Sequence, residues 1–280
     1  MNEKWEEFYS TEQLKRLQQI ELENLRTFIS VCEKLGLEYF LYGGTLLGSV
    51  KYGGFIPWDD DIDVALPRDS YERFIKEGSD LLPKDYYIQD PYNCNKCPYP
   101  YTKLRKKGTQ YVEYVYRNLP IETGIYIDIY PVDHIPDDEK KRYKQFKLVR
   151  KWIDMFVLRQ SRPFDQKENG IKQNIKKSIK IVLSTVLKVF PAKYYVKHID
   201  QYMQMYNKSS DAHRYGALNS PLFENIYSDI YPLVQGEFDD LKVYLPHDYM
   251  DHLTKRYGDI NTLPPANERV GHIPYILKLE

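Results

Sequence analysis

The sequence predicts an α+β fold, with a mixed sheet early in the chain, helices in the middle and an irregular closing segment. Short runs rich in Tyr, Ile and Val, bounded by Gly and Pro, occur before residue 131 and are typical of strands. From Asp137 onward, apolar residues recur at helical spacing instead. The 280 residues suffice for one large domain or two modest ones. We expect a core over residues 1–135, a helical insertion over 136–210 and a C-terminal segment over 211–280 that packs back on the core, together forming one continuous domain.

The elements of the expected core follow from local patterns. Ser10 with Gln13 resembles a capping box, and apolar residues at helical spacing then lead to a stop at Gly36. "EYFLY" is typical of a short strand, and "GGTLLGSV" of a tight turn that opens a helix. "DIDVAL" is strand-like, and "PRDSYERFIKEGSDLL" predicts a helix with Pro67 near its start. Further strands are expected at residues 86–90, 101–105, 109–116 and 124–130.

The second half of the chain is predicted to be mostly helical. Helices are expected over about 137–159, over about 170–190 and after Pro191, and a last one near Tyr249 to Tyr257 among short strands and loops. Residues 170–190 carry apolar residues on one side, with lysines flanking them. A helix of this kind can lie in a membrane interface, so we expect peripheral membrane contact there unless its apolar side packs on the core.

The composition excludes several classes of protein. Lys+Arg 40 cancels Asp+Glu 40, so no overall charge favours nucleic acid as a partner. No apolar run approaches the roughly 18 residues of a membrane span. The opening "MNEKWEEFYS" is charged, and the three cysteines are odd in number, so a cytoplasmic location is expected. Cys94 and Cys97 have zinc-like spacing but no second pair, which leaves zinc open.

The segment "WDDDIDV" crowds Asp59, Asp60, Asp61 and Asp63 ahead of an apolar strand. Because side chains alternate along a strand, Asp59, Asp61 and Asp63 are expected on one face while Asp60 points away. Carboxylates on one face raise one another's pKa unless a cation neutralises them. An exposed acidic turn is the alternative. Hard oxygen ligands suit Mg²⁺, Mn²⁺ or Ca²⁺ rather than zinc.

The spacing rules out an EF-hand. A loop that starts at Asp59 would have Val64 at the required glycine and Ser70 at the required glutamate. A metal-bound nucleotide diphosphate is therefore favoured. Gly43 and Gly44 lie between a strand and a helix start, where backbone N–H groups can approach an anion, and Thr45 adds a hydroxyl. We therefore expect these three residues to contact the donor phosphates.

A third carboxylate is expected from a neighbouring strand. Asp128 in "GIYIDIYPVD" lies between Ile127 and Ile129, where burial is costly without a partner. The alternative is that Asp128 faces solvent on an edge strand. Asp133, further along, is expected to be a cap or turn residue.

The segments "YGGTLLGSVKYGGFIPWDDDIDVALPRDSYERF", "YTKLRKKGT", "GIYIDIYPVD" and "LPHDYMDHLTKRYGDINTLPP" together resemble the LicD family. This family includes bacterial phosphocholine transferases, and fukutin and fukutin-related protein resemble it. The resemblance implies a nucleotidyltransferase-like mixed sheet core whose signature falls on Gly43, Gly44, Asp61, Asp63 and Asp128. Asp59 and Asp60 match the acidic lead-in. Lys103 and Arg105 match a basic strand expected to contact the donor phosphates, unless it is only a solvated basic edge.

The resemblance also implies an activity. This is Mg²⁺- or Mn²⁺-dependent transfer of phosphocholine from CDP-choline to a hydroxyl of a glycan or lipid-linked glycan, with release of CMP. Teichoic acid, lipopolysaccharide or capsule precursors would be the acceptors. Abundant tyrosine, including Tyr111, Tyr114 and Tyr116, could cage a choline. Glycerol-phosphate or ribitol-phosphate transfer, an Asp-X-Asp glycosyltransferase and a non-catalytic scaffold are the alternatives.

Overall fold

A computed structural model describes residues 4–160, 171–220, 226–272 and 274–280. The long first helix, α1 (Thr11–Leu35), begins as expected. The Ser10 side chain accepts a hydrogen bond from the Gln13 N–H, and the Gln13 side chain accepts one from the Ser10 N–H. The helix ends at Gly36, whose φ of 61° is a left-handed conformation that favours glycine. Local sequence therefore sets both ends of this helix.

The central sheet has the strand order β1-β2-β6-β4-β3. Its strands are β1 (Phe40–Leu41), β2 (Asp63–Pro67), β3 (Tyr86–Gln89), β4 (Thr102–Lys106) and β6 (Tyr126–Ile135). Only β2 and β6 in this order run parallel, and the other neighbours are antiparallel. The far end of β6 pairs with β7 (Arg214–Gly216), which pairs with β8 (Ile226–Tyr227). The sheet is mixed, which confirms the predicted fold class.

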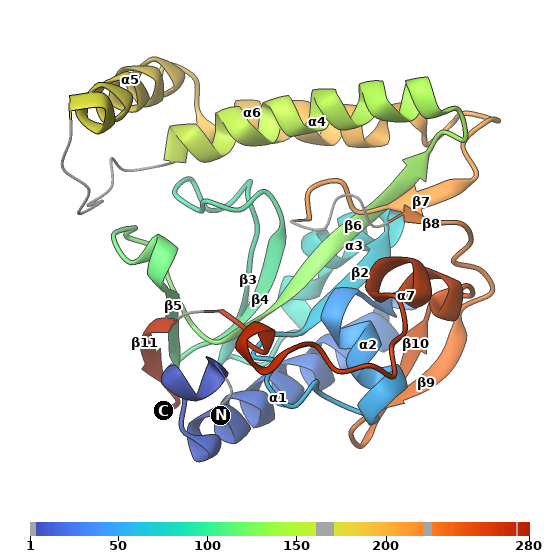
Figure 1. Cartoon of the computed structure of the whole chain (residues 1–280). Coiled ribbons are helices and arrows are strands. Elements are labelled where there is room, and N and C mark those ends of the chain that lie inside the picture. Colours follow the sequence, from blue (N-terminus) through green and yellow to red (C-terminus); the bar gives the residue numbers. More distant parts are fainter. Residues whose placement is uncertain (1–3, 161–170, 221–225, 273) are drawn as a thin grey trace.

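Helices lie around the central sheet (Figure 1). They are α2 (Gly43–Tyr52), α3 (Arg68–Glu77), α4 (Glu139–Gln160), α5 (Ile171–Leu187), α6 (Ala192–Met203) and α7 (Tyr249–Tyr257). Short 3₁₀ turns lie at Lys4–Glu7, Gly78–Leu81, Tyr114–Tyr116, Gln204–Tyr206 and Ala266–Glu268. The helices α4 and α6 lie along one end of the sheet, and α5 lies beyond them (Figure 1). None of the helices in the described part of the chain is long and apolar enough to cross a membrane.

The C-terminal part returns to the first half of the chain. The hairpin of β9 (Val234–Phe238) and β10 (Leu241–Leu245) adds Phe238 and Leu241 to the central core. The strand β11 (Pro274–Lys278) pairs antiparallel with β5 (Gln110–Glu113). The two termini therefore meet on the same side of the molecule (Figure 1).

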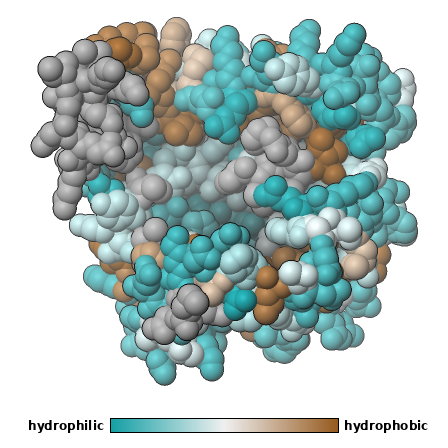
Figure 2. Space-filling view, in the orientation of Figure 1, coloured by the Kyte–Doolittle hydropathy of each residue, from teal (hydrophilic) through white to brown (hydrophobic). Residues whose placement is uncertain are grey.

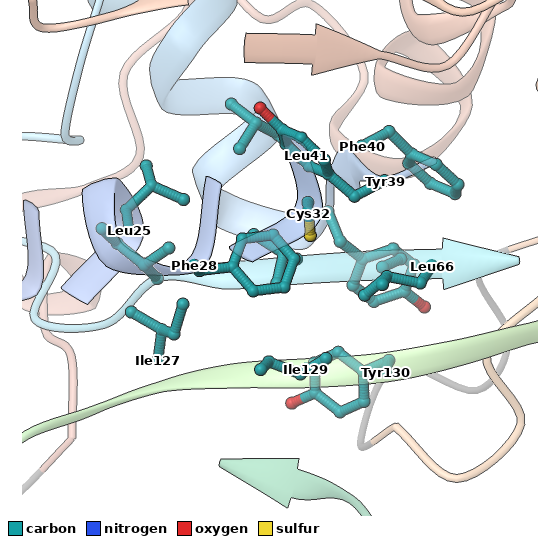
Figure 3. Close-up of a cluster of buried hydrophobic side chains, with 14 of the residues drawn as sticks. Leu25, Phe28, Cys32, Tyr39, Phe40, Leu41, Leu66, Ile127, Ile129 and Tyr130 are labelled. Atoms are coloured by element: carbon teal, nitrogen blue, oxygen red, sulfur yellow. The ribbon is translucent and has the colours of Figure 1, made fainter. Parts of the chain in front are cut away.

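The sheet divides its side chains between two faces. One face carries Val64, Leu104, Ile127 and Ile129, which are fully buried. Ile127 and Ile129 lie beside Phe28 of α1 (Figure 3). Residues directly opposite one another in neighbouring strands share a face. Because Asp63, Lys103 and Asp128 are in register with one another, they share the other face. The apolar periodicity of the strands thus sends the charged side chains to one side.

A second apolar cluster joins the helices to the end of β6. Phe156 of α4 packs with Tyr195, Ile199 and Met203 of α6 and with Ile135 of β6. These side chains are almost fully buried, and apolar burial of this kind stabilises the contact by about 25 cal/mol per Å². The helical layer is therefore fastened to the sheet at one end.

The structure corrects three local predictions. The strand expected over 109–116 ends at Glu113, where a 3₁₀ turn follows. The helix expected to reach Leu82 ends at Glu77. Asp133 was expected to be a cap or turn residue, but it is a buried residue of β6. Arg68 of α3 donates two hydrogen bonds to its carboxylate. A buried carboxylate is tolerated where a guanidinium pairs with it.

Cys94 and Cys97 form a disulfide. Their Cα atoms are 5.5 Å apart, within the range that a disulfide requires. This pairing replaces the zinc alternative, since oxidised cysteines cannot act as thiolate ligands. It also removes the support that the cysteine count lent to a reducing compartment.

Candidate active site

Two carboxylates from different strands meet at the centre of the site. The parallel pairing of β2 with β6 places Asp63 opposite Asp128. Asp128 is 5% exposed, and Asp63 Oδ1 is buried without a hydrogen-bond partner among the residues that the structure describes. An unpartnered buried carboxylate oxygen is costly, so the pair is suited to receiving a cation.

The glycine turn is fastened to the strand that carries Asp63. Gly43, at the start of α2, has a φ of 55°, which a residue with a side chain rarely adopts. A Cβ on Gly44 would lie 3.0 Å from Asp59 Oδ2, so the glycine leaves room for that carboxylate. The Thr45 hydroxyl oxygen accepts a hydrogen bond of 2.8 Å from the Asp63 N–H. Its own O–H hydrogen is left for another acceptor.

Crowding and burial raise the pKa of three carboxyls in the acidic segment. For Asp59, burial is the main cause and the charges of Asp61, Asp60 and Asp63 add to it, raising its pKa. The pKa of Asp63 is raised by burial and then by Asp61 and Asp128. Burial also raises the pKa of Asp61 to about 6, although the neighbouring His272 works in the opposite direction. A divalent cation would relieve this repulsion, as the sequence pattern predicts.

Asp60 has the opposite character. Its carboxylate accepts hydrogen bonds from the hydroxyls of Tyr9 at 2.5 Å and Tyr111 at 2.9 Å, and from the backbone N–H of His272 at 2.9 Å. Burial alone would raise the pKa of Asp60, but the bonds and charge of His272 and the bond from Tyr9 lower it. Asp60 therefore ties three distant segments together. A Cβ on Gly271 would collide with the Asp60 carboxylate, so this position requires glycine.

His272 reaches the acidic segment from the far end of the chain. Its Nδ1 lies 3.3 Å from Asp60 Oδ1 and 3.8 Å from Asp61 Oδ2. Although burial opposes it, the charges of Asp61 and Asp60 raise the pKa of His272 well above its usual value. One ligand atom each from Asp60, Asp61 and His272 lie within 4.8 Å of one another, which makes a potential metal-binding group. Local sequence patterns do not indicate a role for His272 or Tyr9, because neither residue lies in a motif.

Lys103 is the buried cation of the site. Its Nζ donates to Asp128 Oδ1 at 2.5 Å and lies 3.3 Å from the ring centroid of Tyr126. Burial lowers the pKa of Lys103, and the charge of Asp128 opposes this effect. The solvated basic edge is therefore excluded for Lys103, which is 1% exposed.

Arg105 is also buried, on the same strand. Its three nitrogens donate to Gln89 Oε1 at 2.6 Å, the Gly124 carbonyl at 2.6 Å and the Tyr99 hydroxyl at 2.8 Å. These bonds brace the strands around the site. A direct contact to a donor phosphate, as expected from the sequence, would require the guanidinium to give up internal partners.

The three tyrosines considered for a choline cage face different neighbours. Tyr111 is bonded to Asp60, Tyr114 packs against Tyr275 and Tyr116 packs against Tyr99. Although these tyrosines are close in sequence, their rings do not surround one common site, so they do not form the expected choline cage.

Known proteins share sequence similarity with this chain. Residues 36–166 match a family model described as the LicD/FKTN/FKRP nucleotidyltransferase domain. The chain is 28% identical to lipopolysaccharide cholinephosphotransferase LicD of Haemophilus influenzae over 264 residues, which cover 92% of this chain and 95% of that protein. It is 43% identical over 44 residues to ribitol 5-phosphate transferase FKRP of Mus musculus and of Homo sapiens, 16% of this chain and 9% of each of theirs. The domain match includes Gly43, Gly44, Asp61, Asp63 and Asp128, so residues 36–166 are similar to this domain, and the expected resemblance to LicD phosphotransferases is confirmed.

Proposed function

We propose that the chain transfers phosphocholine from CDP-choline to a hydroxyl of a cell-surface glycan precursor and releases CMP. Teichoic acid, lipopolysaccharide and capsule precursors are the acceptor class. The observation that carries the proposal is the register pair of Asp63 with Asp128, beside an unpartnered carboxylate oxygen. The similarity to a lipopolysaccharide cholinephosphotransferase over 92% of the chain favours choline as the head group.

We assign Asp61, Asp63 and Asp128 as the ligands of Mg²⁺ or Mn²⁺. The residues fit such an ion, because they supply hard oxygen atoms whose mutual repulsion a cation would relieve. When bound, the cation would neutralise charge on the donor's diphosphate. Asp60 is a weaker candidate ligand, since its oxygens already accept bonds from Tyr9, Tyr111 and His272.

The remaining groups position the reactants. The backbone N–H groups of Gly44 and Thr45 lie in the first turn of α2, where they could donate hydrogen bonds to a donor phosphate. Lys103 holds the Asp128 carboxylate in place through their 2.5 Å ion pair. In the transfer, the acceptor oxygen bonds to the phosphorus that carries choline, the bond from that phosphorus to the CMP oxygen breaks, and the acceptor proton leaves to solvent or to a nearby carboxylate. We propose that Asp128 also orients the acceptor hydroxyl.

The activity test separates the rival donors. The protein would be incubated with Mg²⁺, a lipopolysaccharide or teichoic acid acceptor and, in turn, CDP-choline, CDP-glycerol, CDP-ribitol and UDP-sugars, while CMP and UDP are measured. We expect CMP from CDP-choline. CMP from CDP-ribitol or CDP-glycerol alone would favour those head groups, and UDP alone would favour the glycosyltransferase.

Site variants link the activity to the assigned residues. Asp63→Asn and Asp128→Ala should each lower turnover by at least about a hundredfold, because each removes a proposed ligand of the cation that would neutralise the donor's phosphates. Asp69→Asn is the matched control, since Asp69 is an exposed carboxylate in the first turn of α3. Turnover near the wild-type value in either site variant would refute the assignment.

We further propose that α5 contacts a membrane at its periphery, on the cytoplasmic side. Over residues 179–190, which run from α5 into the turn after it, most apolar side chains are exposed, including Val182 at 61%, Val186 at 60% and Phe190 at 48%. Figure 2 shows hydrophobic residues gathered at this end of the molecule. Lys180 and Lys188 flank them and could approach anionic headgroups. The first half of the expected apolar side, residues 170–177, lies outside the described side chains.

Vesicle sedimentation tests the membrane contact. Vesicles with anionic lipids should pellet the protein at low salt, and the bound fraction should fall steeply as salt rises. Val182→Ser/Val186→Ser should reduce the bound fraction severalfold. Equal failure to pellet with anionic and neutral vesicles at low salt would refute membrane contact.

A further inference from the structure

A cavity lies between α4 and the segment that leads into β4. Its volume is about 380 Å³, and we call it the α4 pocket. Tyr99, Tyr101 and Tyr116 line one side, and Val149 and Ile153 of α4 line the other. Figure 2 shows the molecule hollowed beneath this helical layer. The volume is in the range of small-molecule sites and is large enough for a sugar ring.

The α4 pocket adjoins the carboxylates. The Tyr101 ring lies 4.8 Å from that of Tyr130, whose hydroxyl donates to Asp128 Oδ2 at 3.3 Å. Lys103 Nζ, which is bonded to Asp128, lies 4.9 Å from the Tyr99 ring centroid and 5.3 Å from that of Tyr101. The tyrosines of the α4 pocket therefore contact side chains that are bonded to Asp128, and one layer of side chains separates the pocket from that carboxylate.

The lining of the α4 pocket includes a buried side-chain amide whose oxygen could accept a hydrogen bond from a ligand. Asn219 is 4% exposed, and its Nδ2 donates to the Pro100 carbonyl at 2.8 Å. Its Oδ1 has no hydrogen-bond partner within the described ranges of the chain. A buried acceptor of this kind is costly unless a ligand O–H or N–H reaches it.

The charges around the α4 pocket disfavour a cationic ligand. Arg150 and Asp154 both line it and form an ion pair at 2.9 Å, so their charges largely cancel. Lys180 adds a positive charge to the lining. A quaternary ammonium would also leave Asn219 Oδ1 unpaired, since it has no N–H or O–H. A neutral ring with hydroxyls fits both observations, and its C–H face can pack on tyrosine rings.

We propose that the α4 pocket binds a sugar ring of the acceptor glycan, at a subsite that one layer of side chains separates from Asp128. Tyr99, Tyr101 and Tyr116 supply the apolar face, and Asn219 Oδ1 accepts a hydrogen bond from a ring hydroxyl. The role as an acceptor subsite rests on the proposed function. Sugar binding itself requires no transfer, so it can be measured independently.

Saturation-transfer NMR tests this assignment with methyl glycosides of glucose, galactose, N-acetylglucosamine and N-acetylgalactosamine, and with tetramethylammonium as the cationic probe. At least one glycoside should bind the wild-type protein. Its signal should fall about five- to tenfold in Asn219→Leu, as expected for one lost hydrogen bond, and comparably in Tyr116→Leu. Tyr143→Leu is the matched control, since Tyr143 is 62% exposed on the same helix, outside the α4 pocket.

Three results would overturn the assignment. They are binding of no glycoside by the wild-type protein, equal glycoside signals in the wild type and both pocket variants, and loss of a tetramethylammonium signal rather than a glycoside signal in Tyr116→Leu. Circular dichroism would confirm that the compared variants are folded. Measuring CMP release by the wild-type protein tests the proposed function separately. Sugar binding without CMP release refutes that function and leaves the α4 pocket assignment standing, whereas CMP release without sugar binding does the reverse.

Discussion

Replacing Asp61 by asparagine should make the metal-free protein more stable. The pKa of Asp61 rises from 3.8 to about 6 on folding, mainly because of burial, so the folded state resists its ionisation. Above pH 7 this difference costs about 3 kcal/mol of folding free energy. Asp61→Asn removes the cost and should raise the free energy of unfolding by up to about 3 kcal/mol at pH 7.5.

The sign of the pH dependence follows from the raised pKa. Both the folded and the unfolded carboxyl bind a proton well below pH 4, so the advantage of Asp61→Asn should shrink as pH falls. It should be roughly half as large at pH 5 as at pH 7.5. Urea unfolding followed by tryptophan fluorescence, in EDTA, measures both values. Adding Mg²⁺ should stabilise the wild type more than the variant, because the cation neutralises the carboxylate only in the wild type.

The neighbouring Asp60 provides a control of opposite sign. Its pKa is lowered by folding, so its ionised form stabilises the protein above the unfolded pKa, and this stability is lost as pH falls through the folded pKa. Asp60→Asn should lower the free energy of unfolding by about 2–3 kcal/mol at pH 7.5, since it weakens charge-assisted hydrogen bonds. If Asp61→Asn destabilises the protein to the same extent at pH 7.5, the acidic segment is not a repulsive cluster and the reasoning fails.

Three further predictions concern stability and metal dependence. Lys103→Met should destabilise the metal-free protein by about 3–5 kcal/mol by leaving Asp128 buried and unpaired, and a second change, Asp128→Ala, should restore part of the loss in urea unfolding. Arg68→Met should lower the melting temperature by roughly 6–15 °C, because the guanidinium pairs with Asp133 and Asp200; a shift below about 2 °C in calorimetry would contradict this. EDTA should abolish CMP release without changing the far-ultraviolet circular dichroism, and Mg²⁺ should restore it; full activity in EDTA would exclude the metal role.

Local sequence determined most of the elements and the centre of the candidate site. The capping pair Ser10 and Gln13 and the stop at Gly36 depend on residues within one helical turn of each helix end, so the pattern alone predicts them. The order of a glycine turn, an acidic strand and a lone aspartate in an apolar strand likewise pointed to Asp63 and Asp128. The structure brings these two side by side because their strands are parallel neighbours.

Local patterns could not show what distant segments contribute. Lys103 has the basic character expected of a phosphate contact, yet it is paired with Asp128 because β4 lies next to β6. His272 reaches Asp60 across 212 positions, and Tyr9 across 51. Such contacts depend on the path of the whole chain rather than on hydrophobic periodicity.

The sequence by itself therefore determined the fold class, the resemblance to the LicD family and the candidate carboxylates, because helix and strand patterns and short motifs are properties of neighbouring residues. Only the tertiary structure decided which carboxylates repel and which are bonded. Asp60 and Asp61 are adjacent in sequence, but folding lowers the pKa of one and raises that of the other. The physical reason is that a pKa depends on burial and on nearby charges and hydrogen-bond donors, and for Asp60 those donors come from both ends of the chain.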